Sequence, residues 1–302
     1  MNVKLKNLIK TVTPAFILYG KHMQLFILKY SAKRRLKKRS LLRFEIDIVS
    51  HCNLNCCSCT HFSPLAEEKF MDTAVFERDF SRLSELTDGK VDFIDLMGGE
   101  PLLHPQISKI AEIARRYFHT GDINIVTNGI LLTEMNDDFW RSCRENNIII
   151  CVSEYLIELN TAKIKQIAES NRVELIFRGK INDKTDKIFN SMWKKVPLDV
   201  EGKQDGRSNY RKCPSANTCI SLNNGRLSTC CLPFVIGFFN QQFGQTIPVT
   251  ERDYIDIFKV KDVDEIFDFL TSPIPICAYC NVTEAKYGVT WGASKKEMGE
   301  WV

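Results

Sequence analysis

Apolar runs of strand length alternate with longer helix-like segments through the first half of the chain, and this alternation is the strongest constraint on its fold. The alternating ranges are, in order, 43–49, 73–86, 91–97, 107–118, 124–127, 139–146, 148–152, 161–170 and 173–177. Strands that alternate with helices predict βαβ units around a parallel sheet. We therefore expect an α/β fold that forms most of a partial barrel.

Residues suited to chemistry follow each predicted strand. A cysteine-rich loop follows the first strand, and the next four strands close on Gly98-Gly99-Glu100-Pro101, Thr127-Asn128-Gly129, Ser153-Glu154-Tyr155 and Arg178-Gly179. In parallel α/β architectures, functional groups gather at the carboxyl ends of the strands. All five motifs are therefore expected to face one mouth of the barrel.

The loop after the first strand contains three cysteines in the pattern Cys52-x3-Cys56-x2-Cys59. This pattern gives an iron–sulfur cluster three thiolates, whereas most such clusters are held by four cysteines, so one iron keeps a position for a small molecule. A structural zinc site is the alternative. No fourth ligand follows at finger-like spacing, although His51 and His61 flank the loop.

The loop spacing and the GGEP motif together resemble the defining motifs of the radical S-adenosylmethionine (radical SAM) superfamily. The resemblance implies a TIM-type partial (β/α)6 barrel and a [4Fe–4S] cluster held by Cys52, Cys56 and Cys59. It also implies that SAM chelates the open iron and is cleaved to a 5′-deoxyadenosyl radical. In such systems the cofactor carries the difficult chemistry and the protein orients it.

The same resemblance assigns SAM-binding roles to the motif of the second strand. Gly98 and Gly99 would let the backbone approach SAM closely. Glu100 would accept hydrogen bonds from the ammonium group of SAM, and Pro101 completes the motif.

Ser153 and Asn128 are further SAM-binding candidates. In the family, a serine at the end of the fourth strand commonly contacts the ribose, and Ser153 falls there. Asn128 is a possible neighbour, although serine and asparagine are also ordinary turn formers. The residue before the third cysteine is often aromatic in the family and is Ser58 here, which removes an expected partner of adenine.

A second set of cysteines follows a polar stretch that ends near residue 212. The segment Cys213-x11-Gly225-x4-Cys230, with Cys277-x2-Cys280 further on, resembles the reduced SPASM region called a twitch domain. Members of that group bind one auxiliary [4Fe–4S] cluster, and the first pair of cysteines flanks a β-hairpin. The Asn-Gly pair at 224–225 predicts the hairpin turn, because both residues tolerate positive φ.

The resemblance implies Cys213, Cys230, Cys277 and Cys280 as the auxiliary ligands. Cys231 remains an alternative to Cys230, since adjacent strand residues point to opposite faces. A four-cysteine zinc ribbon also remains open. We predict three regions: a basic amphipathic segment (1–42), a radical SAM partial barrel (43–212) and a twitch-like auxiliary-cluster domain built from a β-hairpin and a helix (213–302).

Positive charge is concentrated at the amino terminus. Residues 1–43 contain twelve Lys or Arg and no acid, so the rest of the chain carries −8 against a total of +4. Basic residues interleaved with apolar ones are typical of a helix on an anionic membrane surface. A helix packed on the barrel with a solvated basic end is the alternative. Neither a membrane span nor a signal peptide is indicated.

The twelve cysteines are clustered, and no secretory signal precedes them. This pattern indicates metal binding in a reducing compartment and not a disulfide framework. We therefore expect a cytoplasmic protein, with peripheral contact at the inner face of the membrane left open. No nucleic-acid module accompanies the basic residues, so no nucleic-acid partner is expected.

The predicted activity is hydrogen abstraction from a sugar, nucleotide-sugar or cyclitol, by an oxidoreductase or an epimerase. The sequence His61-Phe62-Ser63-Pro64 and the basic arm resemble those of radical SAM proteins of surface-glycan or aminosugar pathways. Peptide or protein maturation is the alternative, although the arm looks too short for the leader-recognition domain such relatives often carry. An electron-transfer or redox-sensing protein is a third hypothesis. A flavodoxin or ferredoxin is the expected reductant.

Five residues are candidates for handling the substrate. Glu154, Tyr155 and Arg178 lie at the predicted mouth, where they could orient hydroxyl groups or take a proton. Cys219 and Cys231 are spare thiols near the second cluster, and a thiol that returns a hydrogen atom would invert a stereocentre. Most spare cysteines are simply small core residues. Lone histidines such as His61 and His104 are more often structural than catalytic.

Overall fold

The computed structural model describes residues 27, 30, 32, 34, 41–155, 157–178, 180–182, 187–189, 194–287 and 291–302. Nearly all of the basic segment 1–42 lies outside the described residues, and so does the surface helix predicted there. Within the ranges described, no helix combines the length and the apolar character that crossing a membrane requires.

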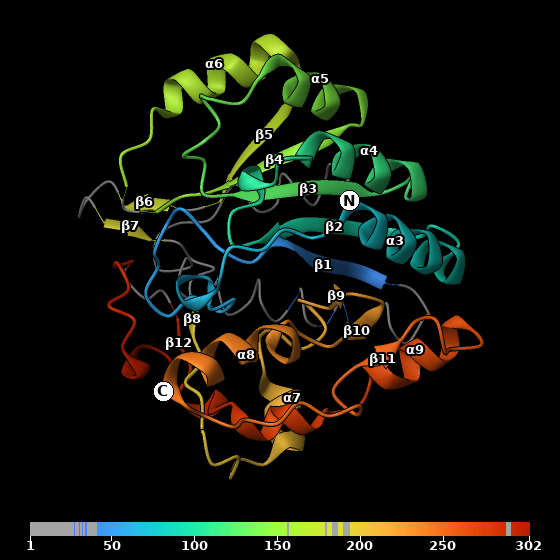
Figure 1. Cartoon of the computed structure of the whole chain (residues 1–302), viewed down its shortest axis with the longest axis vertical. Coiled ribbons are helices and arrows are strands. Elements are labelled where there is room, and N and C mark those ends of the chain that lie inside the picture. Colours follow the sequence, from blue (N-terminus) through green and yellow to red (C-terminus); the bar gives the residue numbers. More distant parts are fainter. Residues whose placement is uncertain are drawn as a thin grey trace.

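Five parallel strands form the centre of an open sheet, in the order of the chain (Figure 1). They are β1 (Leu41–Val49), β2 (Val91–Gly98), β3 (Asp122–Thr127), β4 (Ile148–Ser153) and β5 (Glu174–Arg178). The intervening helices are α3 (Thr73–Thr87), α4 (Ile107–Tyr117), α5 (Asp137–Glu145) and α6 (Thr161–Asn171). The predicted alternation is confirmed, with ends that differ from the predicted ones by two residues or fewer.

Side-chain caps and an aromatic core explain why these helices form where they do. Asp72, Asn136 and Asn160 accept backbone N–H bonds at the starts of α3, α5 and α6, which satisfies donors that a helix cannot pair internally. Between the sheet and the helices, rings from β1, α3 and the end of α4 meet edge to face or stacked. These rings are Phe44, Phe76, Phe80 and Phe118, all fully buried.

The carboxyl-terminal region continues the same sheet beyond β1. A hairpin of β9 (Ser221–Asn223) and β10 (Arg226–Ser228) pairs through β9 with β1, in parallel. Asn224 (φ 47) and Gly225 (φ 73) form its turn, as predicted. β11 (Ile255–Asp256) completes the sheet, whose order is β11-β10-β9-β1-β2-β3-β4-β5. The sixth parallel strand is therefore β9, which joins the edge opposite to β5.

Three helices and several short elements lie around this hairpin, beyond the β1 side of the five-stranded centre (Figure 1). The helices are α7 (Gly206–Lys212), α8 (Leu232–Phe243) and α9 (Val263–Leu270). The remaining strands are β6 (Lys180–Asn182), β7 (Lys187–Phe189), β8 (Lys194–Lys195) and β12 (Lys286–Tyr287). The 3-10 turns are η1 (Ser63–Leu65), η2 (Pro101–Leu103), η3 (Pro275–Tyr279), η4 (Val282–Glu284) and η5 (Met298–Glu300).

A second apolar core lies around α8. Phe62, which follows the cysteine loop, packs in it against Phe239 and against Trp301 near the carboxyl end of the chain. Since β1 and α3 belong to the first core, the cysteine loop connects the two cores. This connection places the loop between the barrel strands and the carboxyl-terminal region.

Candidate active site

One cavity at the carboxyl ends of the strands contains most of the residues singled out by the sequence. Its volume is about 240 Å³. The predicted residues on its wall are Cys52, Cys56, Cys59, Gly98, Gly99, Asn128, Ser153, Tyr155, Arg178, Cys219 and Cys231. The expectation that these motifs face one mouth is confirmed.

The loop cysteines are spaced for a cluster and not for a single ion. Among the described side chains, only Glu45, His61 and Cys231 form a set of three ligand atoms that all lie within 4.8 Å of one another. At least one pair of the three loop sulfurs is therefore further apart than that limit, whereas all thiolates of a tetrahedral zinc site lie about 3.8 Å apart. An iron–sulfur cluster, being larger than an ion, suits the wider spacing.

Burial raises the pKa of Cys52 and of Cys56 to about 12. Hydrogen bonds partly oppose this effect: the backbone N–H of Leu54 donates to Cys52 Sγ at 3.3 Å and Trp291 Nε1–H to Cys56 Sγ at 3.2 Å. Buried thiols with raised pKa values lose their protons to a metal, because its positive charge replaces the lost hydration. The loop therefore suits thiolate ligation by a cluster.

The last residues of the chain, 291–302, hold the cysteine loop, and we call them the C-terminal clasp. The N–H of Cys57 donates to Gly292 O at 2.8 Å, and the N–H of Ser294 donates to Asn55 O at 2.8 Å. Trp301 Nε1–H donates to Cys59 O at 2.9 Å. Together with the Trp291 bond to sulfur, these contacts fix the loop at both ends.

Ser58, which takes the usual place of an aromatic residue, belongs to the same arrangement. It is buried with φ 57, and its hydroxyl donates to Glu300 O at 2.6 Å. Its side chain is therefore used to attach the clasp to the loop. The preceding thiol, Cys57, lies beside the Ser58 hydroxyl and is not on the cavity wall.

The glycines at the end of β2 allow the backbone to approach the end of β1. A Cβ on Gly98 would lie 2.3 Å from Val49 O, and one on Gly99 would lie 1.9 Å from His51 O. Gly98 also has φ +124, which other residues rarely adopt. The close approach predicted for these glycines is thus to the protein backbone, while both also line the cavity.

Glu100 is fully buried and joins the ends of β2 and β3. Its carboxylate accepts hydrogen bonds from Thr127 Oγ1 at 2.6 Å, Asn128 N at 2.8 Å and Leu102 N at 3.0 Å. Burial nevertheless raises the pKa of Glu100 to about 7. Pro101, the next residue, begins the turn η2 that Glu100 caps. The predicted contact of this carboxylate with the SAM ammonium group stays a prediction.

Asn128 links the end of β3 to the cysteine loop. Its Nδ2 donates to Asn53 Oδ1 at 2.7 Å and lies 3.7 Å from Cys52 Sγ. Ser153 ends β4 on the same cavity wall. Asn128 therefore lies beside the cluster loop, and Ser153 lies on the wall of the same cavity. The contacts with SAM predicted for both residues stay a prediction.

The candidate substrate residues at the mouth divide into two groups. Tyr155 and Arg178 line the cavity, and burial, followed by the charges of the loop cysteines, raises the pKa of Tyr155 well above its usual value. The phenol therefore keeps its proton and can donate a hydrogen bond. Glu154 is not on the cavity wall in the described structure, and its backbone N–H donates to Arg178 O at 3.1 Å.

Three polar residues of the cavity region were not predicted as functional. Glu45 and Asp47 lie on β1, and His61 follows the cysteine loop. His61 Nδ1 lies 2.8 Å from Asp47 Oδ2. Burial lowers the pKa of His61, but the charge and hydrogen bond of Asp47 raise it overall to about 10. The sequence did contain a signal for Glu45 and Asp47, namely the charged residues that alternate along β1. Central strands of a parallel sheet are mostly apolar, so charged residues in such a strand indicate a role.

His104, by contrast, has the structural role expected of it. Its Nε2 lies 2.9 Å from Met71 O, and its Nδ1 accepts a bond from Gln106 N. It therefore connects the loop after β2 to the residues that precede α3.

The four cysteines predicted for the auxiliary cluster surround the end of α7. Cys213 ends α7, Cys277 lies in η3, Cys280 ends η3 and Cys230 follows β10. Burial raises the pKa of Cys230 well above its usual value, and the charges of the other three cysteines raise it further. This effect indicates that the four thiols lie close together. The side chain of Asn209 donates to the carbonyls of Cys277 and Cys280.

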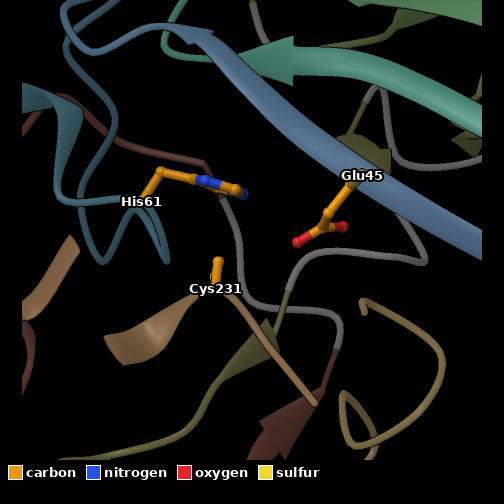
Figure 2. Close-up of side chains that lie close together, drawn as sticks. All are labelled: Glu45, His61 and Cys231. Atoms are coloured by element: carbon orange, nitrogen blue, oxygen red, sulfur yellow. The ribbon is translucent and has the colours of Figure 1, made fainter. Parts of the chain in front are cut away.

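Cys231 points elsewhere. Its sulfur lies with Glu45 and His61 on the wall of the main cavity (Figure 2). The geometry thus favours Cys230 over Cys231 as the auxiliary ligand, although both line the small cavity beside Cys213 and Cys280.

Comparison with known proteins places these observations in a family. Residues 42–182 match the model of the 4Fe-4S single cluster domain. A GTP 3′,8-cyclase of Campylobacter jejuni is 25% identical over 141 residues, which cover 47% of this chain and 42% of that protein. A GTP 3′,8-cyclase of Chlorobaculum tepidum is 32% identical over 93 residues, or 31% and 27% of the two chains. The chain thus spans less than half the length of these curated relatives.

Two solved structures are similar to parts of this chain. The structure of BtrN in complex with AdoMet and 2-DOIA has a TM-score of 0.48 at 18% identity, covering 80% of this chain and 93% of that one. The anSMEcpe structure with bound AdoMet has a TM-score of 0.37 at 20% identity, covering 45% and 42%.

The open parallel sheet, the three-cysteine loop at the end of its first strand and the matched domain define an α/β protein with a [4Fe–4S] cluster domain. These findings support the assignment of the chain to the radical SAM superfamily, with a [4Fe–4S] cluster and SAM as its cofactors.

Proposed function

We propose that the chain is a radical SAM enzyme that removes a hydrogen atom from a hydroxylated carbon of a sugar, nucleotide-sugar or cyclitol. The observation that carries this proposal is that one cavity holds both the cluster loop and several polar side chains. When bound, the cluster and SAM supply a 5′-deoxyadenosyl radical that abstracts hydrogen from C–H bonds. The surrounding side chains must therefore bind SAM, bind the substrate and exclude water.

SAM would be held by residues from three neighbouring strand ends. Gly98 and Gly99 present backbone to the cavity, and Glu100 lies behind them as an acceptor for an ammonium group. Asn128 and Ser153 offer an amide and a hydroxyl that suit the ribose or the carboxylate of SAM. These roles follow the resemblance of the motifs and are supported by their common position.

The same cavity wall also carries polar groups that suit a substrate with several hydroxyl groups. Glu45 contributes a carboxylate, His61 an imidazole, Arg178 a guanidinium group and Tyr155 a phenol that keeps its proton. A binding site fixes the orientation of its ligand through a few well-placed polar groups. A mixture of hydrogen-bond donors and acceptors matches the hydroxyl groups of a carbohydrate better than it matches an apolar side chain.

Dehydrogenation is the reaction that the second cysteine set supports. After hydrogen abstraction and loss of the hydroxyl proton, one electron must leave the substrate carbon for a ketone to form. An auxiliary [4Fe–4S] cluster held by Cys213, Cys230, Cys277 and Cys280 would accept it. Cys230 is adjacent in the chain to Cys231, which lines the substrate cavity. Cys219, also on that wall, is our candidate for returning a hydrogen atom if the enzyme is an epimerase.

We also propose a reducing, cytoplasmic environment and a flavodoxin or ferredoxin as reductant. None of the twelve cysteines forms a disulfide in the structure, and a reducing compartment keeps cysteines in that state.

The test is anaerobic reconstitution with iron and sulfide, followed by addition of SAM and dithionite. We expect 5′-deoxyadenosine, and we expect deuterium from a labelled sugar or cyclitol to appear in it. Cys52→Ala is the control that should form none. Absence of 5′-deoxyadenosine from well-loaded protein would favour an electron-transfer role, and deuterium transfer from peptides alone would favour peptide maturation.

Iron counting in Cys230→Ala and Cys231→Ala tests the auxiliary ligand set.

A further inference from the structure

Three side chains with different metal-ligating atoms, none of them a predicted cluster ligand, converge on the cavity wall. Figure 2 shows the Glu45 carboxylate, the His61 ring and the Cys231 sulfur pointing toward a common centre. Their ligand atoms all lie within 4.8 Å of one another. They come from distant parts of the chain, namely β1, the residues after the cysteine loop and the residue that precedes α8. The tertiary fold therefore creates this cluster.

We propose that Glu45, His61 and Cys231 form a mononuclear site for a divalent metal ion such as Zn²⁺, separate from both iron–sulfur clusters. One thiolate, one imidazole and one carboxylate are all established zinc ligands, whereas Ca²⁺ and Mg²⁺ take oxygen ligands. Three protein ligands leave the fourth position of a tetrahedral ion open. Sites of that kind bind water or a substrate atom at the fourth position.

The orientation of His61 supports a metal ligand. Its Nδ1 lies 2.8 Å from Asp47 Oδ2, so Nε2 is the nitrogen that a metal would bind. Histidine ligands commonly donate their other ring N–H to a carboxylate, which fixes the ring and increases its basicity. Asp47 lies two residues from Glu45 on β1, on the same face of the strand. One strand thus provides a ligand and the residue that positions a second ligand.

The charges around the cluster also favour a cation. Glu45 is 2% exposed and His61 is 9% exposed, and a second carboxylate, Asp47, lies behind the ring. Buried carboxylates are stable when they are paired or coordinate metals. Metal binding would release the proton of the thiol.

The open position of this ion would face the cavity where we place the substrate, and this part of the inference rests on the proposed function. A divalent ion there would bind a hydroxyl oxygen of the substrate and hold the neighbouring C–H toward the SAM side of the cavity. The metal site itself does not depend on the identity of the substrate.

Zinc K-edge X-ray absorption on the reconstituted holoprotein tests the site, because the signal of zinc is separate from that of iron. After incubation with Zn²⁺ and dialysis, we expect about one zinc per chain with one sulfur neighbour at about 2.3 Å and nitrogen or oxygen neighbours at about 2.0–2.2 Å. Zinc in an unloaded auxiliary site would instead show four sulfur neighbours. Full iron occupancy with no bound zinc, or a four-sulfur shell alone, would overturn the proposal.

Variants identify the ligands. Cys231→Ser should remove the sulfur neighbour, and Glu45→Gln should lower zinc occupancy. Asp47→Asn should weaken zinc binding about 10- to 100-fold while leaving the ligand shell unchanged. A residue that only stabilised the fold would not change zinc affinity in this selective way. Cys57→Ser is the matched control, since Cys57 belongs to neither cysteine set and lies off the cavity wall.

Each variant is compared at equal iron content, and unchanged zinc binding in Asp47→Asn and Cys231→Ser would exclude the site. Because 5′-deoxyadenosine formation is measured separately, failure of the metal site and failure of the proposed function are distinguishable.

Discussion

At the scale of single residues, the site depends on buried polar groups and on glycines whose surroundings leave no room for a side chain. Glu100 is fully buried and satisfies three donors, yet its pKa rises because burial disfavours its charge. Gly99 has no room for a side chain. Both residues act on the position of the strand ends and of the cysteine loop, so their substitution should affect stability and cluster loading together.

Glu100→Gln should change how stability depends on pH. In wild type the carboxyl group keeps its proton to a higher pH in the folded state than in the unfolded state. The stabilisation that comes from this raised pKa is therefore complete below about pH 4.5 and decreases as the pH rises toward about 7. Above that pH it no longer changes. The change amounts to about 3 kcal/mol. Thermal unfolding of the cluster-free chain from pH 4.5 to 8 should show wild type losing stability relative to the variant, and parallel curves would contradict the raised pKa.

Gly99→Ala should reduce cluster loading. The added Cβ would lie 1.9 Å from the backbone oxygen of His51, so the residue before Cys52 must move. Overpacking of this kind costs about 1–3 kcal/mol. We expect fewer iron atoms per chain and a lower melting temperature. The control is Gly237→Ala within α8, where nothing lies within 4 Å of the added Cβ, and there stability should rise slightly. Equal behaviour of the two variants would refute the argument.

At the scale of elements, the C-terminal clasp is the feature that most directly affects the cluster. It contacts the cysteine loop by backbone bonds, by two indole N–H groups and by Ser58. Only one of the two indoles reaches a sulfur: Trp291 donates to Cys56 Sγ, whereas Trp301 donates to a backbone oxygen. Hydrogen bonds to cluster sulfurs tune reduction potentials, because they stabilise the more negative, reduced state.

Trp291→Phe should therefore lower the reduction potential of the loop cluster. If the lost bond is worth about 1 kcal/mol more in the reduced state, the shift is about −40 mV. Potentiometric titration followed by EPR measures it. Trp301→Phe provides the comparison, since it removes an indole from the same clasp without removing a bond to sulfur. A potential unchanged in Trp291→Phe, or an equal shift in both variants, would show that the bond has no such role.

At the scale of the whole molecule, the barrel and the carboxyl-terminal region share one sheet. β9 extends the sheet at β1, and the turn of the hairpin is attached to α3: Gly225 N donates to Asp79 Oδ2 at 2.7 Å, and Arg78 bonds to Asn224. Arg82 of α3 donates to the carbonyls of Ile257 and Val260. The boundary predicted at residue 212 thus separates segments that complete each other's structure.

A fragment ending at residue 212 should therefore hold its cluster poorly. It lacks β9, which covers the edge of β1, and it lacks the clasp. We expect low solubility and less iron per chain than in a full-length variant with the four auxiliary cysteines changed to alanine, which keeps the loop contacts. Soluble yield and iron content measure this. A fragment that loads as well as the full-length variant would show that the barrel is independent.

The sequence predicted the helices and strands of the barrel, because apolar periodicity and turn residues are local properties. It also predicted the shared mouth, since the carboxyl ends of parallel strands must lie together. The Asn224-Gly225 turn was recognisable for the same local reason. By contrast, nothing in the sequence indicated that Trp291 would reach Cys56, or that β9 would pair with β1.

The cysteine spacing, the GGEP motif and the alternation of elements thus determined by themselves the superfamily, its cofactors and the position of the cluster loop. Only the tertiary structure decided that Cys231, and not Cys230, lies on the main cavity wall, that Glu45 and His61 meet Cys231, and that the C-terminal clasp holds the loop. The physical reason is distance along the chain. Local patterns fix strands, turns and loops, but contacts between residues about 170 to 240 positions apart depend on how all the elements pack.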